Sequence, residues 1–309
     1  MNPQNHILNL FLGLIAVLVV SSVVAFILKA KFGAENKTVS NLTSRINAWW
    51  AMILVIFAFT YLGKNAVIFL FLLVSFAALR EFLSLIYIRR GDHIALVVCF
   101  YVILPAQYIF IYADWYAMAM IFIPVYGFLF LPILAAICGD AAYFLERSTK
   151  IQWALMICVF CISHIPALLL LDLESGSSME LMLFLILVVQ SSDVLQYVWG
   201  KLFGKRKIAP SISPSKTVVG FVGGVLSASA LAACLHHLTP FGAVGAFFIG
   251  LAVCMMGFLG GLVMSAIKRD LGVKDWGYMI SGHGGMLDRM DSLCFAAPIF
   301  FHIVRYFYA

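Results

Sequence analysis

Long apolar runs dominate this sequence and restrict the folds that it can adopt. The first run, residues 6–28, contains no Asp, Glu, Lys or Arg, and comparable runs recur to the end of the chain. Apolar residues make up 64% of the 309 residues, against about half in soluble globular proteins. Lipid admits only helices or closed barrels, and unbroken runs of about 20 apolar residues favour helices. The sequence therefore predicts an all-α, polytopic integral membrane protein.

Ten hydrophobic spans can be distinguished by comparison with the ~20 residues that one membrane crossing needs. They are residues 6–28, 48–63, 65–87, 94–113, 116–137, 153–171, 181–200, 218–238, 241–266 and 293–308. The second and tenth spans are short, so a re-entrant or strongly tilted segment is an alternative for both. No internal repeat or linker divides the chain, and we therefore expect one membrane domain over residues 1–309.

The basic residues are distributed unequally between the two sides that these spans define. Eighteen of the 20 Lys and Arg residues fall in alternate loops on one side, and only Lys64 and Arg305 fall on the other. Basic loops stay on the cytoplasmic side of a membrane, which places both termini outside. This asymmetry accounts for the net charge of +6, so we expect membrane lipids and no nucleic acid as partners.

One polar stretch, from Ser265 to Asp291, interrupts the apolar sequence. It combines five glycines with charges of both signs: Gly272, Gly277, Gly282, Gly284, Gly285, Lys268, Arg269, Asp270, Lys274, Asp275, Asp288, Arg289 and Asp291. Carboxylate oxygens suit a hard divalent cation, basic side chains neutralise phosphate charge, and glycines let backbone N–H groups approach anionic oxygens. The stretch indicates a divalent cation bound together with a polyphosphate. The alternative is a charged loop between two helices.

Asp193 lies twelve residues beyond Leu181 in the seventh span, well inside the apolar region at ~1.5 Å rise per residue. An ionisable side chain at that depth is unfavourable and indicates a functional site. Two structural alternatives are a shorter span that leaves Asp193 at the membrane interface, and a hydrogen bond to another helix.

The loop after the seventh span is strongly basic and ends in hydroxyl residues. Anionic lipid head groups explain its segment from Lys205 to Lys207. They do not explain Ser213, Lys216 and Thr217 at the start of the eighth span. Hydroxyls, a lysine and the unpaired N–H groups of a helix N-terminus together favour phosphate.

Asp288 and Asp291 are three residues apart, and both lie on one helix face if the last helix begins near Leu287. Neighbouring carboxylates repel each other without a cation, which favours a metal site. Helix capping is the competing explanation for Asp288. For His283, which lies between glycines, we prefer a hydrogen bond to phosphate over the roles of base or turn residue.

Two small-xxx-small patterns, Gly220–Gly224 and Gly257–Gly261, permit close helix packing in the eighth and ninth spans. The patterns alone do not say whether the packed helix belongs to the same chain or to a second subunit. A homodimer is therefore left open.

Together these residues resemble the signature of the phosphatidate cytidylyltransferases, also called CDP-diacylglycerol synthases. The resemblance covers about residues 190 to 295 and rests mainly on Ser265, Ile267, Lys268, Arg269, Lys274, Asp275, Gly277, Ile280, His283, Gly284, Gly285, Met286, Asp288, Arg289, Met290 and Asp291. Upstream it includes Asp193, Tyr197, Gly200, Gly204, Pro210, Ser213, Lys216 and Thr217. The sequence departs from the family pattern at Gln196, Val218–Val219 and Ser281, which indicates a divergent member.

The resemblance implies transfer of the cytidylyl group of CTP to a lipid phosphate, phosphatidate, at the cytoplasmic face of a cell (inner) membrane. It implies Mg²⁺, with a second cation left open, held by Asp193, Asp275, Asp288 and Asp291. Catalytic roles are implied for Asp193, Lys216, Lys268, Asp275, His283, Asp288 and Asp291. Substrate-binding roles are implied for Ser213, Thr217, Arg269, Lys274, Gly284, Gly285 and Arg289. The site would lie in residues 181–309, with residues 1–180 as a scaffold.

Two alternative functions are retained. The acceptor of the cytidylyl group is an isoprenoid or ether-lipid phosphate in the first. The second, from another class, is a cation-coupled transporter with Asp193 as its ion site. A transporter predicts acidic residues near the membrane midplane in several spans, and only Asp193 meets that condition.

Overall fold

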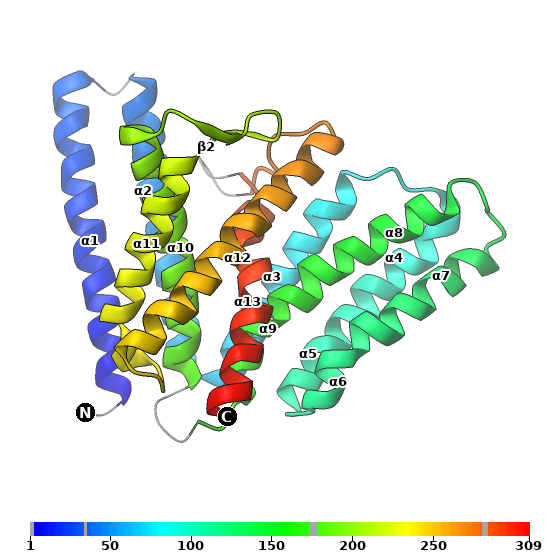
Figure 1. The fold of residues 1–309 in the computed structure, drawn as a ribbon. Coiled ribbons are helices and arrows are strands. Elements are labelled where there is room, and N and C mark those ends of the chain that lie inside the picture. The colour runs from blue at the N-terminus through cyan, green and yellow to red at the C-terminus, as the bar shows by residue number, and fades with distance from the viewer. Residues whose placement is uncertain (1–2, 34–35, 174–177, 280–283) are drawn as a thin grey trace.

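The computed structural model describes residues 3–33, 36–173, 178–279 and 284–309, and most of them are helical (Figure 1). Three long helices begin the chain: α1 (Pro3–Phe32), α2 (Lys37–Leu62) and α3 (Lys64–Ser84). The predicted all-α membrane fold is confirmed, and the described residues add one short pair of strands to it.

The next three predicted spans are built from shorter helical pieces. The fourth contains a 3₁₀ turn (Arg90–Asp92), α4 (His93–Val98), a π-helical turn (Cys99–Ile103) and α5 (Leu104–Tyr112). The fifth contains α6 (Tyr116–Ile121), a π-helical turn (Phe122–Gly127) and α7 (Phe128–Ile137). The sixth contains α8 (Phe144–Leu155), a π-helical turn (Met156–Cys161), α9 (Ile162–Ala167) and a 3₁₀ turn (Leu168–Leu170).

Each of these π-helical turns lies within five residues of a proline: Pro105, Pro124 or Pro166. Proline lacks the N–H group for the helical hydrogen bond, and its ring clashes with a carbonyl of the preceding turn. A locally wider helical turn relieves both problems and lets the helix continue. The changes of pitch thus lie near prolines, whereas Pro132 of α7 and Pro298 of α13 lie in regular α-helix.

The C-terminal part consists of α10 (Ser178–Phe203), a β hairpin, α11 (Val218–Cys234), a 3₁₀ turn (His236–Leu238), α12 (Ala243–Asp270) and α13 (Leu287–Tyr308). The hairpin pairs β1 (Lys207–Ala209) with β2 (Ser213–Thr217) in an antiparallel arrangement. α10 packs against α11, α12 and α13, and α13 also contacts α3 and α9. Phe184 of α10 stacks on Phe300 of α13, with 5.9 Å between ring centroids, in the buried core.

Eight helical segments among the described residues are long and apolar enough to cross a membrane, by length and composition. They correspond to the first seven predicted spans and the ninth. The second, expected to be short, is long enough because its apolar helix runs over Leu42–Leu62. α11 has only 17 residues and ends at Cys234, earlier than the prediction for the eighth span. α13 begins at Leu287, because the charged residues before the tenth span are helical too.

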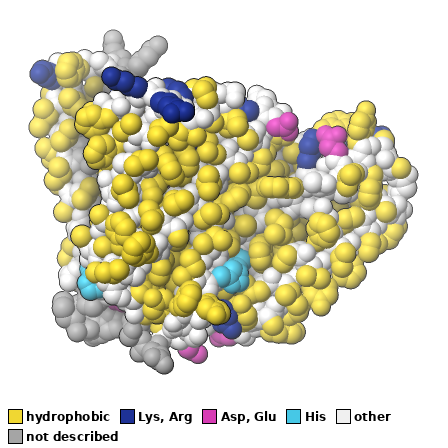
Figure 2. Space-filling model, viewed as in Figure 1, with side chains coloured by type: hydrophobic (Ala, Val, Ile, Leu, Met, Phe, Trp, Pro, Cys, Tyr) yellow, Lys and Arg dark blue, Asp and Glu magenta, His cyan; other side chains and the backbone are white. Residues whose placement is uncertain are grey.

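Figure 1 places both termini at its lower end and the β hairpin at its upper end. Figure 2 shows Lys and Arg side chains mainly along that upper edge, with a broad hydrophobic surface below it. The two ends of the molecule thus differ in basic charge, as the distribution of Lys and Arg along the sequence predicts. The polar stretch that follows α12 begins at the upper end.

Candidate functional site

Glycines on α11 and α12 let the C-terminal helices approach closely at the upper end. A Cβ atom at Gly224 of α11 would lie 2.6 Å from the Cα atom of Gln196 on α10. A Cβ atom at Gly257 of α12 would lie 3.5 Å from the Cβ atom of Ser292 on α13. Both small-xxx-small patterns therefore pack helices of one chain against each other. The homodimer stays a prediction.

Asp193 and Asp291 form the first acidic group of this end, which we call the open pair. Asp193 Oδ1 accepts a hydrogen bond from Ser292 Oγ at 3.1 Å, and Asp291 precedes Ser292 on α13. The two carboxylates interact electrostatically with each other and with Lys216 and Arg289. Among the described residues, neither carboxylate forms an ion pair with a Lys or Arg side chain. The negative charge of the open pair is thus offset by basic side chains that form no ion pair with it.

Lys216 extends from β2 toward α12 beside the open pair. Its Nζ atom donates to the carbonyl oxygen of Phe258 at 3.3 Å and lies 4.7 Å from the centroid of the Phe258 ring. A Cβ atom at Gly261 would be 2.8 Å from this Nζ atom, so Lys216 lies directly over this glycine of α12. Burial lowers the pKa of the Lys216 ammonium, while Asp291 and Asp193 act in the opposite direction. An anionic ligand would therefore stabilise the charged form further.

Arg289 supplies the second cation near the open pair. Its Nε atom is buried and has no hydrogen-bond partner within the described part of the chain. Its backbone carbonyl accepts a hydrogen bond from Gln190 Nε2 of α10 at 3.0 Å, which fixes α13 against α10 at this level. A buried donor without a partner is unfavourable, and an anionic oxygen would satisfy it.

Asp288 forms the second acidic group, and its oxygens are already occupied. Oδ1 accepts a hydrogen bond from Lys268 Nζ at 2.7 Å, and the two side chains are buried. Oδ2 accepts the backbone N–H groups of Trp276 at 2.8 Å and Gly285 at 2.9 Å. The N-cap of α13 is Met286, which makes no side-chain capping hydrogen bond, and Asp288 lies inside the first turn. The structure therefore does not place Asp288 at the N-cap, and its predicted metal role is untested.

Steric contacts explain why glycines precede α13. Gly284 has a φ of +81°, where a side chain would be strained, and a Cβ atom there would lie 2.6 Å from Asp288 Oδ2. A Cβ atom at Gly285 would overlap the carboxylate of Glu81. The N–H group of Gly285 already binds Asp288, so the predicted contact of Gly285 with substrate would have to use another atom.

Glu81 is the residue that the sequence analysis missed. It lies on α3, is 5% exposed, and accepts the backbone N–H groups of Met286 at 2.8 Å and Leu287 at 2.9 Å. The sequence does contain a signal for it. Glu81 is an ionisable residue inside an apolar span, which is the same observation that singled out Asp193.

The remaining predicted residues surround these groups or lie apart from them. Thr217 caps α11, because its Oγ1 atom accepts the N–H group of Gly220 at 3.0 Å, and Ser213 is buried in β2. Arg269 donates to the carbonyl oxygens of Ile212 at 3.3 Å and Val273 at 3.0 Å. Lys274 and Asp275 are exposed. His283 lies outside the described residues.

Among the residues that the structure describes, side chains that could bind one metal ion lie together in groups of at most two. Among the described residues, no three His, Cys, Asp or Glu side chains lie close enough together to hold one ion. Asp275 is exposed and Asp288 is engaged by Lys268, which leaves the open pair as the acidic group that can accept a cation. The structure does not test the metal itself.

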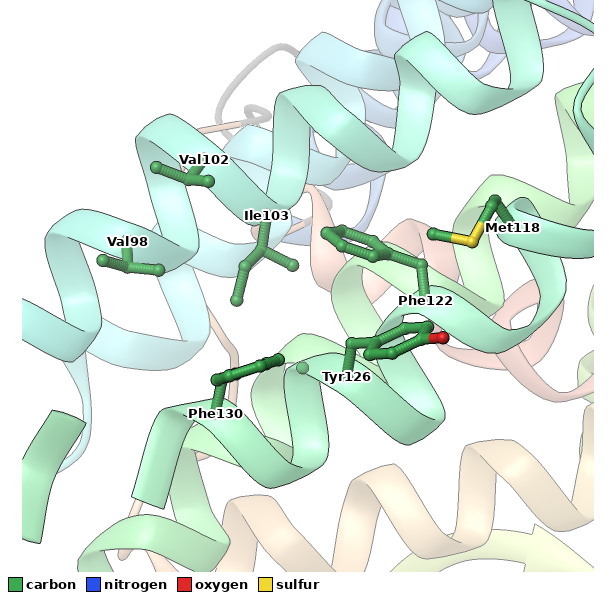
Figure 3. Close-up of a pocket in the computed structure, with 8 residues that line it drawn as sticks. Val98, Val102, Ile103, Met118, Phe122, Tyr126 and Phe130 are labelled. Atoms are coloured by element: carbon green, nitrogen blue, oxygen red, sulfur yellow. The ribbon is translucent and has the colours of Figure 1, made fainter. Parts of the chain in front are cut away.

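A pocket elsewhere in the molecule has a different character. Figure 3 shows it between the π-helical turns of the fourth and fifth spans, lined by Val98, Val102, Ile103, Met118, Phe122, Tyr126, Gly127 and Phe130. None of these side chains carries a charge, so the pocket offers nothing to a nucleotide or a metal ion. The polar groups at the upper end are therefore the better candidate site.

Comparison with known proteins assigns the chain to a family. The sequence matches the cytidylyltransferase family over residues 43–307. It is 38% identical over 269 residues to the uncharacterized protein YnbB of Escherichia coli (strain K12), covering 85% of this chain and 87% of that protein. It is 40% identical over 142 residues to the phosphatidate cytidylyltransferase of Aquifex aeolicus (strain VF5), covering 45% and 53%. For the enzyme of the same name from Bacillus subtilis (strain 168), identity is 43% over 122 residues, covering 39% and 45%.

The alignments span about half the length of the two relatives named for phosphatidate. The family match is much longer and includes Glu81, the hairpin, the open pair and Asp288. It favours the enzyme over the cation-coupled transporter. The chain therefore belongs to the cytidylyltransferase family and is a CTP-dependent nucleotidyltransferase.

Proposed function

We propose that this protein transfers the cytidylyl group of CTP to phosphatidate, with CDP-diacylglycerol and pyrophosphate as products. Relatives named phosphatidate cytidylyltransferase support this choice of acceptor. The structural observation that carries the proposal is the open pair beside Lys216 and Arg289, where unsatisfied charges of both signs lie between apolar helices and a polar loop.

The proposed reaction joins two anions. A phosphate oxygen of the lipid attacks the α-phosphorus of CTP, and the bond from this phosphorus to the oxygen that bridges to the β-phosphate breaks. The attacking oxygen is already anionic, so charge neutralisation and positioning matter more than removal of a proton. Lys216 and Arg289 suit this task, because neither forms an ion pair among the described residues.

Mg²⁺ fits the open pair better than it fits Asp288. In proteins this ion is usually held by one or two carboxylates together with substrate phosphate oxygens and water. Asp193 and Asp291 can bind it without losing an ion pair, whereas Asp288 would lose Lys268 and two backbone N–H groups. When bound there with CTP, the ion would neutralise charge on the phosphate oxygens. Asp193 and Asp291 are thus its proposed ligands.

The acceptor is tested with purified protein in lipid nanodiscs, radiolabelled CTP and a panel of lipid phosphates. Phosphatidate should yield labelled CDP-diacylglycerol with one pyrophosphate per product. The same preparation of an Asp291→Asn variant controls for a contaminating enzyme. If label appeared only with an isoprenoid or ether-lipid phosphate, phosphatidate would be the wrong acceptor, although CTP would remain the donor.

We further propose that the site faces the cytoplasm of a cell with the protein in its inner membrane. The excess of Lys and Arg at the upper end supports this orientation (Figure 2). In a cysteine-free background, an Asp172→Cys variant should react with an impermeant maleimide in intact cells. A Phe203→Cys variant, at the other end of α10, should react only after permeabilisation. The reverse pattern would contradict the orientation.

A further inference from the structure

We propose that Glu81 is a positioning residue for the cytidylyl-transfer site, an inference that rests on the function proposed above. Its carboxylate lies at the N-terminus of α13 and accepts the N–H groups of Met286 and Leu287, 205 and 206 residues further along the chain. α13 carries Asp288, Arg289 and Asp291 in its first turns. Glu81 therefore fixes the helix from which most of the site extends.

The polar stretch folds around this carboxylate from two sides. A Cβ atom at Gly277 would lie 2.8 Å from Glu81 Oε1, and a Cβ atom at Gly285 would overlap the same carboxylate. Beside Glu81, the ring of Phe82 stacks on Trp276, with 5.0 Å between centroids and 19° between planes. Two glycines of the stretch, eight residues apart, therefore lie against one side chain of α3.

The charge of Glu81 is balanced by the helix and not by a cation. Among the described residues, no Lys or Arg side chain forms an ion pair with it. The free N–H groups and the dipole of a helix N-terminus favour an anion. In many proteins that anion is a phosphate, but here the protein's own carboxylate occupies the place. The substrate phosphates are left to Lys216, Arg289 and a bound cation.

Glutamate suits this role better than its nearest substitutes. The N–H groups of Met286 and Leu287 bond to different oxygens of Glu81, and a carboxylate provides both as acceptors. Glutamine keeps one acceptor but turns an NH₂ group toward the second N–H donor. Aspartate is one methylene shorter and would not reach α13 without a shift of the helix. Both changes should therefore displace the first turn of α13.

The first experiment compares Glu81→Gln with Ser75→Ala, a control on the same helix. Ser75 is buried, is bonded to Tyr108 at 2.6 Å, and lies six residues before Glu81, about 9 Å along the axis of α3. We expect Glu81→Gln to lower kcat by about 10²-fold, as small displacements of reacting groups do, with KM for CTP changed less than about threefold. Ser75→Ala should lower only the unfolding temperature. Near-normal kcat in Glu81→Gln, or the same kcat loss in Ser75→Ala, would overturn the proposal.

A double-mutant cycle tests the same contact from the side of Gly285, where the single variant keeps Glu81. Gly285→Ala adds a methyl group that overlaps the Glu81 carboxylate, so it should reduce kcat in the wild-type background by about 10²-fold. In a Glu81→Ala background the methyl group has room, and Gly285→Ala should reduce kcat no further. Additive losses would show that the two residues act independently and would overturn the proposal.

Amide hydrogen exchange separates this inference from the proposed function. In Glu81→Gln, the peptide that contains Gly285, Met286 and Leu287 should exchange at least about tenfold faster than in wild type. This measurement needs no CTP turnover, so an inactive wild type would count against the proposed function alone. Unchanged exchange in this peptide would count against Glu81, whatever the wild-type activity.

Discussion

Two groups of buried or half-buried charges in this molecule contain similar side chains and differ in how they are satisfied. Near the start of α8, Arg147 is 4% exposed and donates to Asp92 at 3.1 Å and to the carbonyl oxygen of Ala142 at 2.6 Å. Asp140 forms ion pairs with both Arg147, at 3.0 Å, and Arg89, at 2.9 Å. We call these four charged residues the arginine clamp, in which two acids meet two arginines.

The open pair and its neighbours Lys216 and Arg289 present the same two kinds of charge, but with few direct contacts. Asp193 and Asp291 have only hydroxyl or backbone donors as hydrogen-bond partners, and Arg289 Nε has none among the described residues. A buried charge that is paired contributes to the fold, and one that is unpaired lowers stability until a ligand arrives. The comparison therefore assigns stability to the arginine clamp and ligand binding to the open pair.

The largest effect is expected from breaking the arginine clamp. Arg147→Leu leaves Asp92 buried without its partner, and should lower the free energy of unfolding by about 3–5 kcal/mol. Lys150→Met is the matched control on α8, because it removes an exposed ion pair with Glu146 and should lower it by less than about 1 kcal/mol. Denaturant unfolding in detergent measures both. Similar losses of unfolding free energy in the two variants would mean that the arginine clamp contributes no more stability than an exposed ion pair.

The next largest effect is expected at the open pair, on catalysis. Asp291→Asn should lower kcat by about 10³-fold without lowering stability, because it removes an unpaired charge that holds the cation. Asp288→Asn should instead lower stability, since Lys268 loses its buried partner. A titration of activity with Mg²⁺ distinguishes them: the half-saturating concentration should rise in Asp291→Asn and stay constant in Asp288→Asn. Equal shifts would mean that Asp288 also binds the cation.

A smaller loss, about 10²-fold, is expected for Asp193→Asn. Asparagine keeps an oxygen that can accept the hydrogen bond from Ser292, so geometry is preserved and only charge is lost. Raised Mg²⁺ should then restore part of the activity. Normal cytidylyl transfer by this variant would exclude Asp193 from the mechanism and leave Asp291 as the sole proposed ligand.

The smallest effect should come from Ser292→Ala, which removes the donor to Asp193 and leaves both carboxylates in place. Partners of metal ligands typically contribute 10- to 100-fold, and we expect about tenfold here, at the lower limit, because Asp193 keeps its charge. The measurement is kcat/KM for CTP at fixed Mg²⁺. A loss as large as that of Asp193→Asn would mean that Ser292 itself contacts a substrate.

The sequence predicted most of the helices because apolar runs are a local property. The tenth span was predicted to begin at residue 293, whereas α13 begins at Leu287, which meets the condition stated for Asp288 and Asp291 to share a helix face. The sequence did not predict the β hairpin, since strands of three and five residues carry little signal of their own. It also did not predict that α11 ends as early as Cys234. The sequence did not predict the π-helical turns, because a proline in an apolar run does not determine how the helix adapts to it.

For the site, the sequence identified the residue types and the structure supplied their partners. Asp193, Lys216, Lys268 and Asp291 were all predicted, and they do interact electrostatically at one end of the molecule. That Asp288 is satisfied by Lys268 and two N–H groups depends on the fold of the loop, which no spacing reveals. Glu81 was missed because its partners are backbone atoms more than 200 residues away.

The stack of Phe82 on Trp276 gives the loop an optical label of its own. Trp276 is 2% exposed, whereas the other five tryptophans are half-buried or exposed. An indole in such surroundings fluoresces at a shorter wavelength than one in contact with water. The difference between the emission spectra of the wild type and a Trp276→Phe variant is therefore the signal of Trp276, whose backbone N–H group donates to Asp288. Any rearrangement of the polar stretch on nucleotide binding would be visible in this emission without an added probe.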